Sequence, residues 1–510
     1  MTTNEFDVVV LGGGSGSQIA SAAAAEGLEA AVLEPGPLGG ACITRGCVPS
    51  KALVQRADLL EEIRRAGRFG IDATVEGIDF GAITETIEST VYEKADRQRG
   101  TLEGTAGLTL YEAVGRFVDE RTIALERDEG ESSGHDSTDR NDAPGRIRGD
   151  HVVIAVGGRP VVPPIDGLED VPYLTSDDAL FLEERPETLV IVGGGYIGVE
   201  LCHVFAAVGT DVTLVGRSES LLPDADADVS EAVTEALAAR TDCYTGHEVT
   251  AVSSRNGGVR VTAESGDGET VDLDGDELLV ATGREPNTDA LGLERAGVET
   301  DERGHVAVDE CLETTSENVW ALGDVLAAHP YKHAADYEAR VVTRNLLERA
   351  LGRGEREDRG ETDERGETDG PVTVEYDTVA HAVFTHPQVA SVGQTEDALE
   401  EAGRAYEATT VPYDVAPLGM LLDLDEAAFV KVLASPDGEV LGCHVVGPQA
   451  STLIHEVVVA METGPGTLEA LADVVHVHPA LSEVLLVAFD EAAGRPHSTA
   501  PDWRGLREGM

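Results

Sequence analysis

The sequence predicts an α/β protein with two similar units of parallel strands and helices, followed by a C-terminal α+β domain. Three observations predict this class. An apolar run, a glycine-rich turn and an apolar helix follow one another at residues 6–27, and again at residues 188–209. A strand that leads into a glycine turn also occurs twice, at residues 151–160 and 277–288. From about residue 372 the pattern changes to strands that would pair as hairpins, which is typical of an α+β domain.

Charge is the unusual feature of the composition. The 510 residues include 96 Asp and Glu against 37 Lys and Arg, which gives a formal net charge of −59. Such a surface repels nucleic acid and anionic membranes, so we expect neither as a partner. Because concentrated salt screens the self-repulsion, the composition favours a halophilic, cytoplasmic protein from a salt-accumulating organism. The alternative is an acidic protein that needs a basic partner.

The remaining composition excludes several classes of protein. Hydrophobic residues make up 41% of the chain, which allows large cores, and the length suits about three domains. Six cysteines in a chain of this length do not make a secreted disulfide framework. The N-terminus has no basic region or long apolar run, so we expect no signal peptide. No apolar stretch approaches the length of about 18 residues that a membrane span needs.

The first glycine turn has the spacing of a dinucleotide-binding fingerprint. Gly12 permits a tight turn, and Gly14 lets the backbone approach a pyrophosphate at the helix N-terminus, with Ser17 at the third position. The next strand ends at Glu34, about twenty residues on, where a carboxylate would hold an adenosine ribose. An acidic residue there predicts FAD or NAD, whose ribose is unphosphorylated. The sequence therefore predicts a Rossmann-like domain.

The second turn carries all three glycines of the same fingerprint, at Gly193, Gly195 and Gly198. Its next strand ends in Gly216 and Arg217, without a ribose-binding acid. An arginine at this point can bind a 2′-phosphate through two hydrogen bonds, which predicts NADPH over NADH. The alternative is a solvent-facing arginine. Three carboxylates follow and would weaken a phosphate site: Asp224, Asp226 and Asp228.

Two cysteines lie close together in the segment 39–51, which reads GGACITRGCVPSK. We interpret Cys42 and Cys47 as a redox-active dithiol at the start of a helix, where the helix dipole and Lys51 would stabilise a thiolate. The alternatives are two small buried residues or a zinc site. Zinc takes four ligands, and no second close Cys/His pair follows nearby, so no metal is expected.

A histidine near the C-terminus is a candidate general acid/base. His478 precedes Pro479, and Glu483 follows five residues on, where its carboxylate could orient the imidazole. The alternative is a turn that contains a half-buried histidine. The dithiol earlier in the chain favours the catalytic interpretation.

Together these motifs resemble the class I pyridine nucleotide–disulfide oxidoreductases, a family that includes dihydrolipoyl dehydrogenase, glutathione reductase, mycothione reductase and mercuric reductase. The resemblance lies in GGACITRGCVPSK, ATGREPNT, ALGDV and HVHPALSE, in this order. It covers nearly the whole chain outside two acidic segments, 127–149 and 352–370. It implies an FAD-binding and central domain at 1–160 and 286–350, an NAD(P)-binding domain at 161–285 and a dimerisation domain at 372–497.

The resemblance also implies an enzyme that uses FAD and NADPH, and a homodimer whose active site is shared between subunits. Cys47 would contact the flavin as the charge-transfer thiolate, and Cys42 would attack a small-molecule disulfide. Lys51, paired with Glu200, would lie by the flavin. His478, oriented by Glu483, would act from the partner subunit.

The resemblance implies further cofactor contacts. Glu34 would bind the FAD ribose and Asp324 the ribityl chain. The expected FAD-binding residues are Gly12, Gly14, Ser15, Gly16, Glu34, Gly40, Ala41, Lys51, Gly157, Asp324 and Ala334. The expected NADP-binding residues are Gly193, Gly195, Gly198, Arg217 and Gly283.

Within the family, the residues narrow the choice of substrate. The chain ends without the cysteine pair of mercuric reductases, and Ala22 and Ala23 occupy the positions of the arginine pair that glutathione reductases use. Gly216 stands where dihydrolipoyl dehydrogenases usually have an acid. We therefore expect NADPH-linked reduction of another small disulfide. The acidic composition resembles haloarchaeal proteins, whose thiol is γ-glutamylcysteine, so the expected substrate is bis-γ-glutamylcystine. The alternatives are a dihydrolipoyl dehydrogenase of a 2-oxoacid dehydrogenase complex, a mercuric reductase-like enzyme and a structural flavoprotein.

Overall fold

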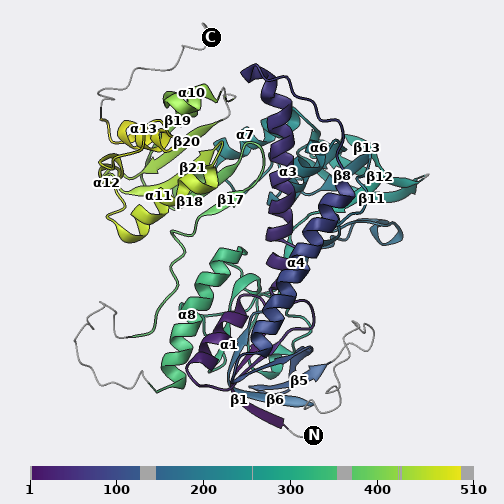
Figure 1. The fold of residues 1–510 in the computed structure, drawn as a ribbon, viewed down its shortest axis with the longest axis vertical. Helices are drawn as coiled ribbons and strands as arrows, with labels where there is room; N and C mark the ends of the chain where they lie inside the picture. The colour runs from purple at the N-terminus through teal and green to yellow at the C-terminus, as the bar shows by residue number, and fades with distance from the viewer. Residues whose placement is uncertain are drawn as a thin grey trace. The chain divides into compact units, whose positions relative to one another are not determined.

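The computed structural model describes residues 3–126, 145–255, 257–352, 370–422, 424 and 428–495 (Figure 1). The chain forms two compact units. The first comprises Met1–Pro49, Glu85–Val161 and Arg284–Val374, and the second comprises Ser50–Thr84, Val162–Gly283 and Glu375–Met510. Two long helices, α3 (Cys47–Arg65) and α4 (Phe80–Glu103), contain two of the points at which the chain passes between the units. The finer domain boundaries expected above stay predictions.

A seven-stranded sheet forms the centre of the first unit, in the order β3-β2-β1-β6-β5-β4, with β16 also paired to β6. Parallel pairing joins β1 to β2 and to β6, and the last four residues of β1 are buried because strands flank them on both sides. The strands are β1 (Thr3–Leu11), β2 (Ala30–Leu33), β3 (Leu108–Tyr111), β4 (Val114–Phe117), β5 (Thr122–Glu126), β6 (Arg146–Ile154) and β16 (Val319–Ala321).

Helices α1 (Gly16–Ala25) and α8 (Lys332–Ala350) lie side by side in this unit (Figure 1). The alanines of α1 keep its buried face shallow, so that the helix packs closely on β1 and β2. A short antiparallel pair, β7 (Gly158–Pro160) with β15 (Arg284–Pro286), joins the ends of the two strand-and-glycine repeats. The repeats seen in the sequence therefore meet in space.

The end of the acidic segment 127–149, whose polar and Gly/Ser/Asp-rich composition predicts a solvated loop, is a strand. Residues 127–144 lie outside the described residues, but Arg146–Ile154 is strand β6, and Ile147 pairs with Asn4 and is fully buried. Buried and less buried residues alternate at the start of β6, as in a strand with one buried face. Because most residues of the segment are polar, this alternation cannot be recognised in the sequence. Of the second acidic segment, residues 353–369 lie outside the described residues.

The second unit contains a four-stranded parallel sheet in the order β10-β9-β8-β14. Its strands are β8 (Thr188–Val192), β9 (Asp211–Val215), β10 (Asp242–Tyr244) and β14 (Glu277–Val280), accompanied by α6 (Tyr196–Ala207) and α7 (Ala227–Ala238). An antiparallel sheet of three strands follows, formed by β11 (His247–Arg255), β12 (Gly258–Ser265) and β13 (Thr270–Gly275). Strand β8, helix α6 and strand β9 repeat the order of β1, α1 and β2.

The C-terminal part of the second unit is an antiparallel sheet of five strands, in the order β17-β18-β21-β20-β19. The strands are β17 (His381–Val383), β18 (Val389–Gly393), β19 (Glu407–Pro412), β20 (Phe429–Ala434) and β21 (Val440–Val446). Helix α11 (Ala450–Thr463) contacts β18 and β21, and α13 (Ser482–Ala492) contacts β19 and β20. The predicted fold class is thus confirmed: two parallel α/β sheets precede an α+β domain. No helix within the described ranges is long and apolar enough to cross a membrane.

Candidate active site

The first glycine turn is held by contacts that only glycine allows. Gly12 has a φ of +110°, and a Cβ at this residue would lie 2.2 Å from the carbonyl oxygen of Ala155. The Ser17 hydroxyl donates to the carbonyl of Gly14 at 2.8 Å, which closes the turn just inside α1. A Cβ on Gly14 would find its nearest neighbour 3.7 Å away, so the backbone there is open to a ligand. This narrow turn at a helix N-terminus fits the pyrophosphate of a dinucleotide.

Glu34 lies beside this turn, just after β2. One carboxylate oxygen accepts a hydrogen bond from the Gly13 amide at 2.8 Å, and the other accepts one from the Gly36 amide at 3.0 Å. The backbone therefore fixes the carboxylate next to the glycine turn, where the ribose hydroxyls of FAD would need an acceptor. Turn and acid together fit the adenosine half of FAD.

The other residues expected to hold FAD belong to the same unit, except Lys51, which belongs to the second. Asp324 lies in a short 3₁₀ helix, Gly323–Val325, and Arg284 Nε approaches its carboxylate at 3.5 Å. The amide of Gly323 donates to the buried Glu338 at 2.6 Å, which fixes this turn. Ala334 is buried in the first turn of α8, and Gly157 has a φ of +66°. Their contacts with the cofactor stay predictions.

The two cysteines lie on successive helices of the first unit. Cys42 is in the middle of α2 (Gly40–Thr44), and Cys47 is the first residue of α3. Both are free thiols, with Cys42 half-buried and Cys47 exposed. A hydrogen bond to Cys47 and burial raise the pKa of Cys42 well above its usual value. Cys42 therefore needs help from a base or a cation to become a thiolate, whereas Cys47 lies at a helix N-terminus that favours one.

Lys51 and Glu200 form the ion pair that the family resemblance implies. Lys51 Nζ lies 2.6 Å from one oxygen of Glu200, and the other oxygen accepts a hydrogen bond from the Phe384 amide at 3.0 Å. The ammonium also lies 5.0 Å from the centre of the Phe384 ring. Lys51 is one turn beyond Cys47 along α3, so the pair follows the dithiol closely in the chain.

The second glycine turn repeats the first with tighter packing. Gly193 has a φ of +129°, and a Cβ there would lie 2.2 Å from the carbonyl oxygen of Ala281, as at Gly12 and Ala155. A Cβ on Gly198 would lie only 1.9 Å from the Gly193 oxygen. Gly195 precedes α6 and has open space around it, so the backbone at the helix N-terminus is accessible. The turn fits a second dinucleotide.

Arg217 is exposed just beyond β9, and no residue of the described ranges gives it a hydrogen bond or an ion pair. Gly216, which replaces the ribose-binding acid, is fixed by a hydrogen bond from its amide to the Tyr244 carbonyl at 2.9 Å. The end of β9 therefore presents a cation without a carboxylate beside it in sequence. This arrangement suits a 2′-phosphate.

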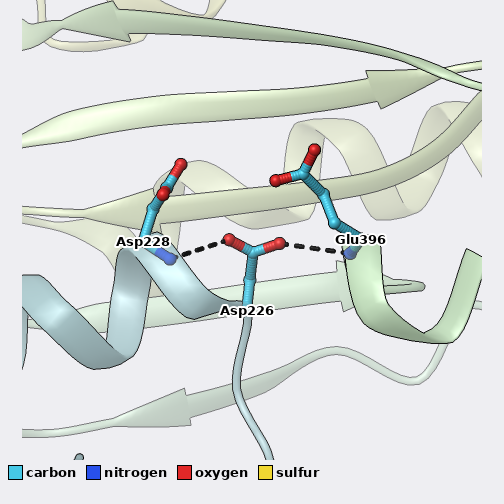
Figure 2. Close-up of side chains that lie close together, drawn as sticks. All are labelled: Asp226, Asp228 and Glu396. Atoms are coloured by element: carbon cyan, nitrogen blue, oxygen red, sulfur yellow. Dashed lines mark hydrogen bonds between the residues drawn. The ribbon is translucent and has the colours of Figure 1, made fainter. Parts of the chain in front are cut away.

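Two of the three carboxylates expected to weaken a phosphate site are engaged elsewhere. Lys431 Nζ lies 2.7 Å from Asp226, 2.8 Å from Asp228 and 2.5 Å from Glu396. Figure 2 shows that Asp226 also accepts hydrogen bonds from the amides of Asp228 and Glu396. Burial would lower the pKa of Lys431, but these carboxylates raise it overall. Asp226 and Asp228 therefore share one ammonium with Glu396, and the ammonium takes the place that a metal ion would take.

His478 and Glu483 are paired as expected. His478 Nδ1 lies 2.8 Å from one oxygen of Glu483, whose other oxygen accepts a hydrogen bond from the Ala480 amide at 2.9 Å. The imidazole is 67% exposed, so its other nitrogen is accessible. The pair has the geometry of an oriented general acid/base.

A second histidine–glutamate pair was not predicted from the sequence. His476 Nε2 lies 2.6 Å from Glu456 on α11, and the His476 side chain is only 5% exposed. The hydrogen bond to Glu456 raises the pKa of His476. The sequence signal for this second pair was the alternation of valine and histidine at residues 475–478. In the structure, Val475 and Val477 are 94% and 74% exposed. Exposed valines of this kind are typical of a surface that another subunit covers.

The structure thus gathers the expected residues into two groups, one in each unit. The first unit holds the FAD-type turn and the dithiol. The second holds the Lys51–Glu200 pair, the second nucleotide turn with Arg217, and the His478–Glu483 pair.

Comparisons with known proteins agree with this combination. The model of the pyridine nucleotide-disulphide oxidoreductases matches residues 6–345, and that of their dimerisation domain matches residues 379–489. The chain is 34% identical over 497 residues to a dihydrolipoyl dehydrogenase of Haloferax volcanii, with 96% of each chain covered. It is 33% identical over 485 residues to a mycothione reductase of Mycobacterium tuberculosis, covering 94% of this chain and 98% of that protein.

Among solved structures, the Cu(II) complex of the HOCl-induced flavoprotein disulfide reductase RclA from Escherichia coli is similar to this chain. It superposes with a TM-score of 0.78 at 27% identity, and the match covers 96% of this chain and 100% of RclA.

Proposed function

The chain belongs to the pyridine nucleotide-disulphide oxidoreductase family, and from that premise we propose that it uses NADPH to reduce a low-molecular-weight disulfide through Cys42 and Cys47. Membership makes it an FAD-dependent flavoprotein enzyme that works with NAD(P)H. The dimerisation domain supports a homodimer. The observation that carries the proposal is the hydrogen-bonded cysteine pair in the same unit as the FAD-type glycine turn.

FAD, when bound, supplies the route by which two electrons pass from NADPH to the sulfurs. The chain's own residues then perform the thiol chemistry. Cys42, as a thiolate, attacks one sulfur of the substrate disulfide and forms a mixed disulfide, while the other substrate sulfur leaves as a thiolate. Cys47 attacks Cys42, releases the second substrate thiol and restores the Cys42–Cys47 disulfide.

His478 has the geometry for the proton steps. The pKa of Cys42 is raised, so its thiol must lose a proton before it attacks. The substrate thiolate that leaves must gain a proton. The Glu483 carboxylate holds Nδ1 of His478, which leaves Nε2 to exchange that proton. In the homodimer we assign this histidine to the active site of the partner subunit.

Arg217 supports NADPH as the reductant. It is exposed and lacks a partner in the described part of the chain, while Lys431 occupies two of the nearby carboxylates. A dianionic 2′-phosphate would therefore meet an arginine, with Glu219 two residues on as the nearest carboxylate in sequence.

Bis-γ-glutamylcystine is the substrate that we propose, because the net charge of −59 and the haloarchaeal relatives favour an organism that uses γ-glutamylcysteine. One observation favours a second candidate: the 34% identity to the Haloferax volcanii enzyme suits dihydrolipoyl dehydrogenase activity. The mycothione reductase match suits a small-thiol disulfide instead.

Steady-state assays in molar KCl test the proposal, with NADPH and NADH each paired with bis-γ-glutamylcystine, mycothione, glutathione disulfide and lipoamide. We expect the highest kcat/KM for NADPH with bis-γ-glutamylcystine. Preference for NADH with lipoamide would replace this function by the dihydrolipoyl dehydrogenase alternative. Cys42→Ser should keep the yellow flavin and abolish reduction of every disulfide; retained turnover would show that the cysteine pair is incidental.

A further inference from the structure

His203 is a fully buried histidine of the second unit that the proposed chemistry does not use. It lies on α6, three residues after Glu200, so the two side chains are neighbours on one face of the helix. Nε2 of the ring lies 2.9 Å from Oδ1 of Asp58, and Nδ1 lies 3.4 Å from Nη1 of Arg240. Because an arginine can only donate, Nδ1 must accept, and Nε2 carries the proton that Asp58 accepts.

Two polar pairs join α3 to α6, and His203 belongs to the second. In the first pair, Lys51 Nζ lies 2.6 Å from Glu200; in the second, Asp58 binds His203. Lys51 and Asp58 are seven residues apart, which is about two turns of α3. Contacts at two separate points on each helix resist both sliding and rotation of one helix against the other, which a single contact cannot do.

The segment before β18 is fixed to the same two helices. The Phe384 amide donates to Glu200 at 3.0 Å. Two residues on, His386 stacks its ring on that of His203, with the ring centres 6.1 Å apart. Arg65 on α3 donates to Nε2 of His386 at 2.7 Å. Three segments that are far apart in the sequence are therefore held together around His203.

We propose that His203 is a positioning residue for the Lys51–Glu200 pair. Its contacts with Asp58 and His386 fix α6 against α3 and against the segment before β18. The inference rests on the proposed function, in which Lys51 lies by the flavin and electrons pass from NADPH to the cysteines. A cation held in place there would stabilise the negative charge that the flavin gains. His203 acts only through Glu200 and Lys51.

The burial of the partners shows which contact would weaken without His203. Asp58 is 41% exposed, so its carboxylate can turn to solvent when it loses the imidazole. Glu200 is only 5% exposed, and the Phe384 amide still holds one of its oxygens. A shift of α6 against α3 would therefore lengthen the distance between Glu200 and Lys51, whose long side chain is partly exposed and free to follow α3.

The scarcity of lysine allows a direct test. The holoenzyme contains four lysines: Lys51, Lys94, Lys332 and Lys431. Acetylation by acetic anhydride is followed at each of them by mass spectrometry at fixed pH and molar KCl, with the exposed Lys94 as internal reference. We expect His203→Leu to raise the ratio of the Lys51 rate to the Lys94 rate about three- to tenfold, because the ammonium spends more time away from Glu200. Asp58→Ala, which removes the same pair but keeps the buried ring, should raise the ratio by a similar factor.

Two further variants serve as controls. His203→Gln should stay close to the parent, because its amide can both donate to Asp58 and accept from Arg240. His444→Leu is the matched control: His444 is a buried histidine of the same unit, and its Nδ1 lies 3.0 Å from the Ser391 hydroxyl. Its loss should lower stability without changing the acetylation ratio.

Stopped-flow reduction of the bound flavin by NADPH is the second readout. We expect His203→Leu to slow it about tenfold at saturating NADPH, a smaller loss than removal of a direct electrostatic contact causes. The apparent Kd for NADPH and the oxidation of the reduced enzyme by disulfide should stay as in the parent.

An unchanged acetylation ratio or an unchanged rate of flavin reduction in His203→Leu would overturn the proposal. An equal rise of the ratio in His444→Leu would also overturn it, because it would indicate general loosening of the unit. Since acetylation does not depend on turnover, His203 can fail this test while disulfide reduction stands. Disulfide turnover by Cys42→Ser would instead remove the proposed function and leave the acetylation ratios valid.

Discussion

At the scale of a single side chain, we predict that Arg217 sets the preference between NADPH and NADH. We expect Arg217→Gln to lower kcat/KM for NADPH about 10- to 100-fold and to leave that for NADH nearly unchanged, because a charge-assisted hydrogen-bond pair contributes about 1.5–3 kcal/mol. Arg217→Glu should go further and favour NADH. Arg260→Gln, which removes an exposed arginine paired with Asp274 on β13, is the control. An unchanged ratio of the two nicotinamides in the Arg217 variants would refute the NADPH assignment.

His478 and His476 allow a matched comparison of two histidine–glutamate pairs. His478 is exposed, whereas His476 is almost fully covered. We expect His478→Gln to reduce kcat about 10²- to 10⁴-fold, because the proton steps lose their acid/base. His476→Gln should mainly reduce stability and leave kcat within a few fold. Stopped-flow reduction of the enzyme-bound flavin by NADPH should be unaffected in both. Equal losses of kcat in the two variants would contradict the role of His478.

Lys431 supports stability through a buried ion cluster. Its side chain is 1% exposed, and that of Asp226 is fully buried. Lys431→Met would leave Asp226 as a buried carboxylate without its cation, which costs about 3–5 kcal/mol of unfolding free energy. Chemical denaturation in fixed molar KCl measures the loss, with Lys94→Met as the exposed control. The Lys431→Met, Asp226→Asn double variant should recover part of the stability, and failure to do so would exclude this explanation.

At the residue scale the sequence predicted which local residues pair, such as His478 with Glu483, but not the supporting charges. Cys42, Cys47 and the pair His478–Glu483 are close in sequence, so local spacing was sufficient to find them. Lys431 could not be found in this way, because it is 205 residues from Asp226 and the contact depends on the packing of α7 against β21, next to β20. The long-range pair Lys51–Glu200 was predicted only through the family resemblance.

At the scale of strand, turn and helix, the two nucleotide turns differ at the third position of the glycine fingerprint, which is Ser17 in the first turn and Gly198 in the second. Ser17 fits in the first turn because its hydroxyl bonds to Gly14, whereas any side chain at Gly198 would collide with the Gly193 carbonyl. We expect Gly198→Ser to raise KM for NADPH at least about tenfold, because the turn must open and the pyrophosphate loses backbone amides. Ser17→Gly should change FAD retention little. Unchanged NADPH kinetics in Gly198→Ser would contradict the role of this turn.

A cluster of basic side chains on several elements of the second unit predicts loss of stability in acid. His386 Nε2 lies 2.7 Å from Arg65 on α3, and its ring stacks on that of His203 from α6. Burial first, and then the charges of Arg65, His203 and Arg240, lower the pKa of His386 to about 4, against an opposing effect of Asp58. The folded state therefore binds a proton less readily than the unfolded state.

The sign of the effect follows from this depressed pKa. Above about pH 6.5 the histidine is neutral in both states, and its contribution to stability is fully present; between 6.5 and 4 the unfolded state takes up the proton first, so stability falls. We expect the unfolding free energy to drop by up to roughly 3 kcal/mol across this range. His386→Asn should flatten this part of the pH profile. Buried His151 on β6, whose pKa burial also lowers to about 4, should add a similar loss in the first unit.

At the scale of the whole molecule, the net charge of −59 makes stability depend on salt. Three of the four lysines, Lys51, Lys332 and Lys431, are paired with carboxylates, and Lys94 is exposed on α4. The 37 Lys and Arg together cannot balance the 96 Asp and Glu. We expect Tm to rise steeply with KCl up to about 1 M, where the Debye length falls to about 3 Å. NaCl should act alike, since the effect is screening; a flat Tm profile would contradict this account.

The order of the motifs predicted the fold class, because each strand with its glycine turn and helix is a local element of an α/β sheet. The sequence could not show where the polar segment 127–149 returns to a strand, since only Ile147 points into the core there. Nor could it show that the second nucleotide unit and the C-terminal domain share Lys431 and its carboxylates. Such contacts depend on the packing of segments that are far apart in the chain.

The pairing of β7 with β15 brings together the two ends of residues 161–283, which makes this stretch a candidate for exchange by protein engineering. Pro160 and Arg284, which flank this stretch, are paired residues of neighbouring antiparallel strands, so the two ends of the stretch lie next to each other. A segment grafted between them from a relative would have to preserve the contacts of this stretch with the rest of the second unit, such as Glu200 with Lys51 and Asp226 with Lys431. Chimeras cut at these two positions offer a route to exchange electron donors among salt-adapted flavoenzymes in a single cloning step.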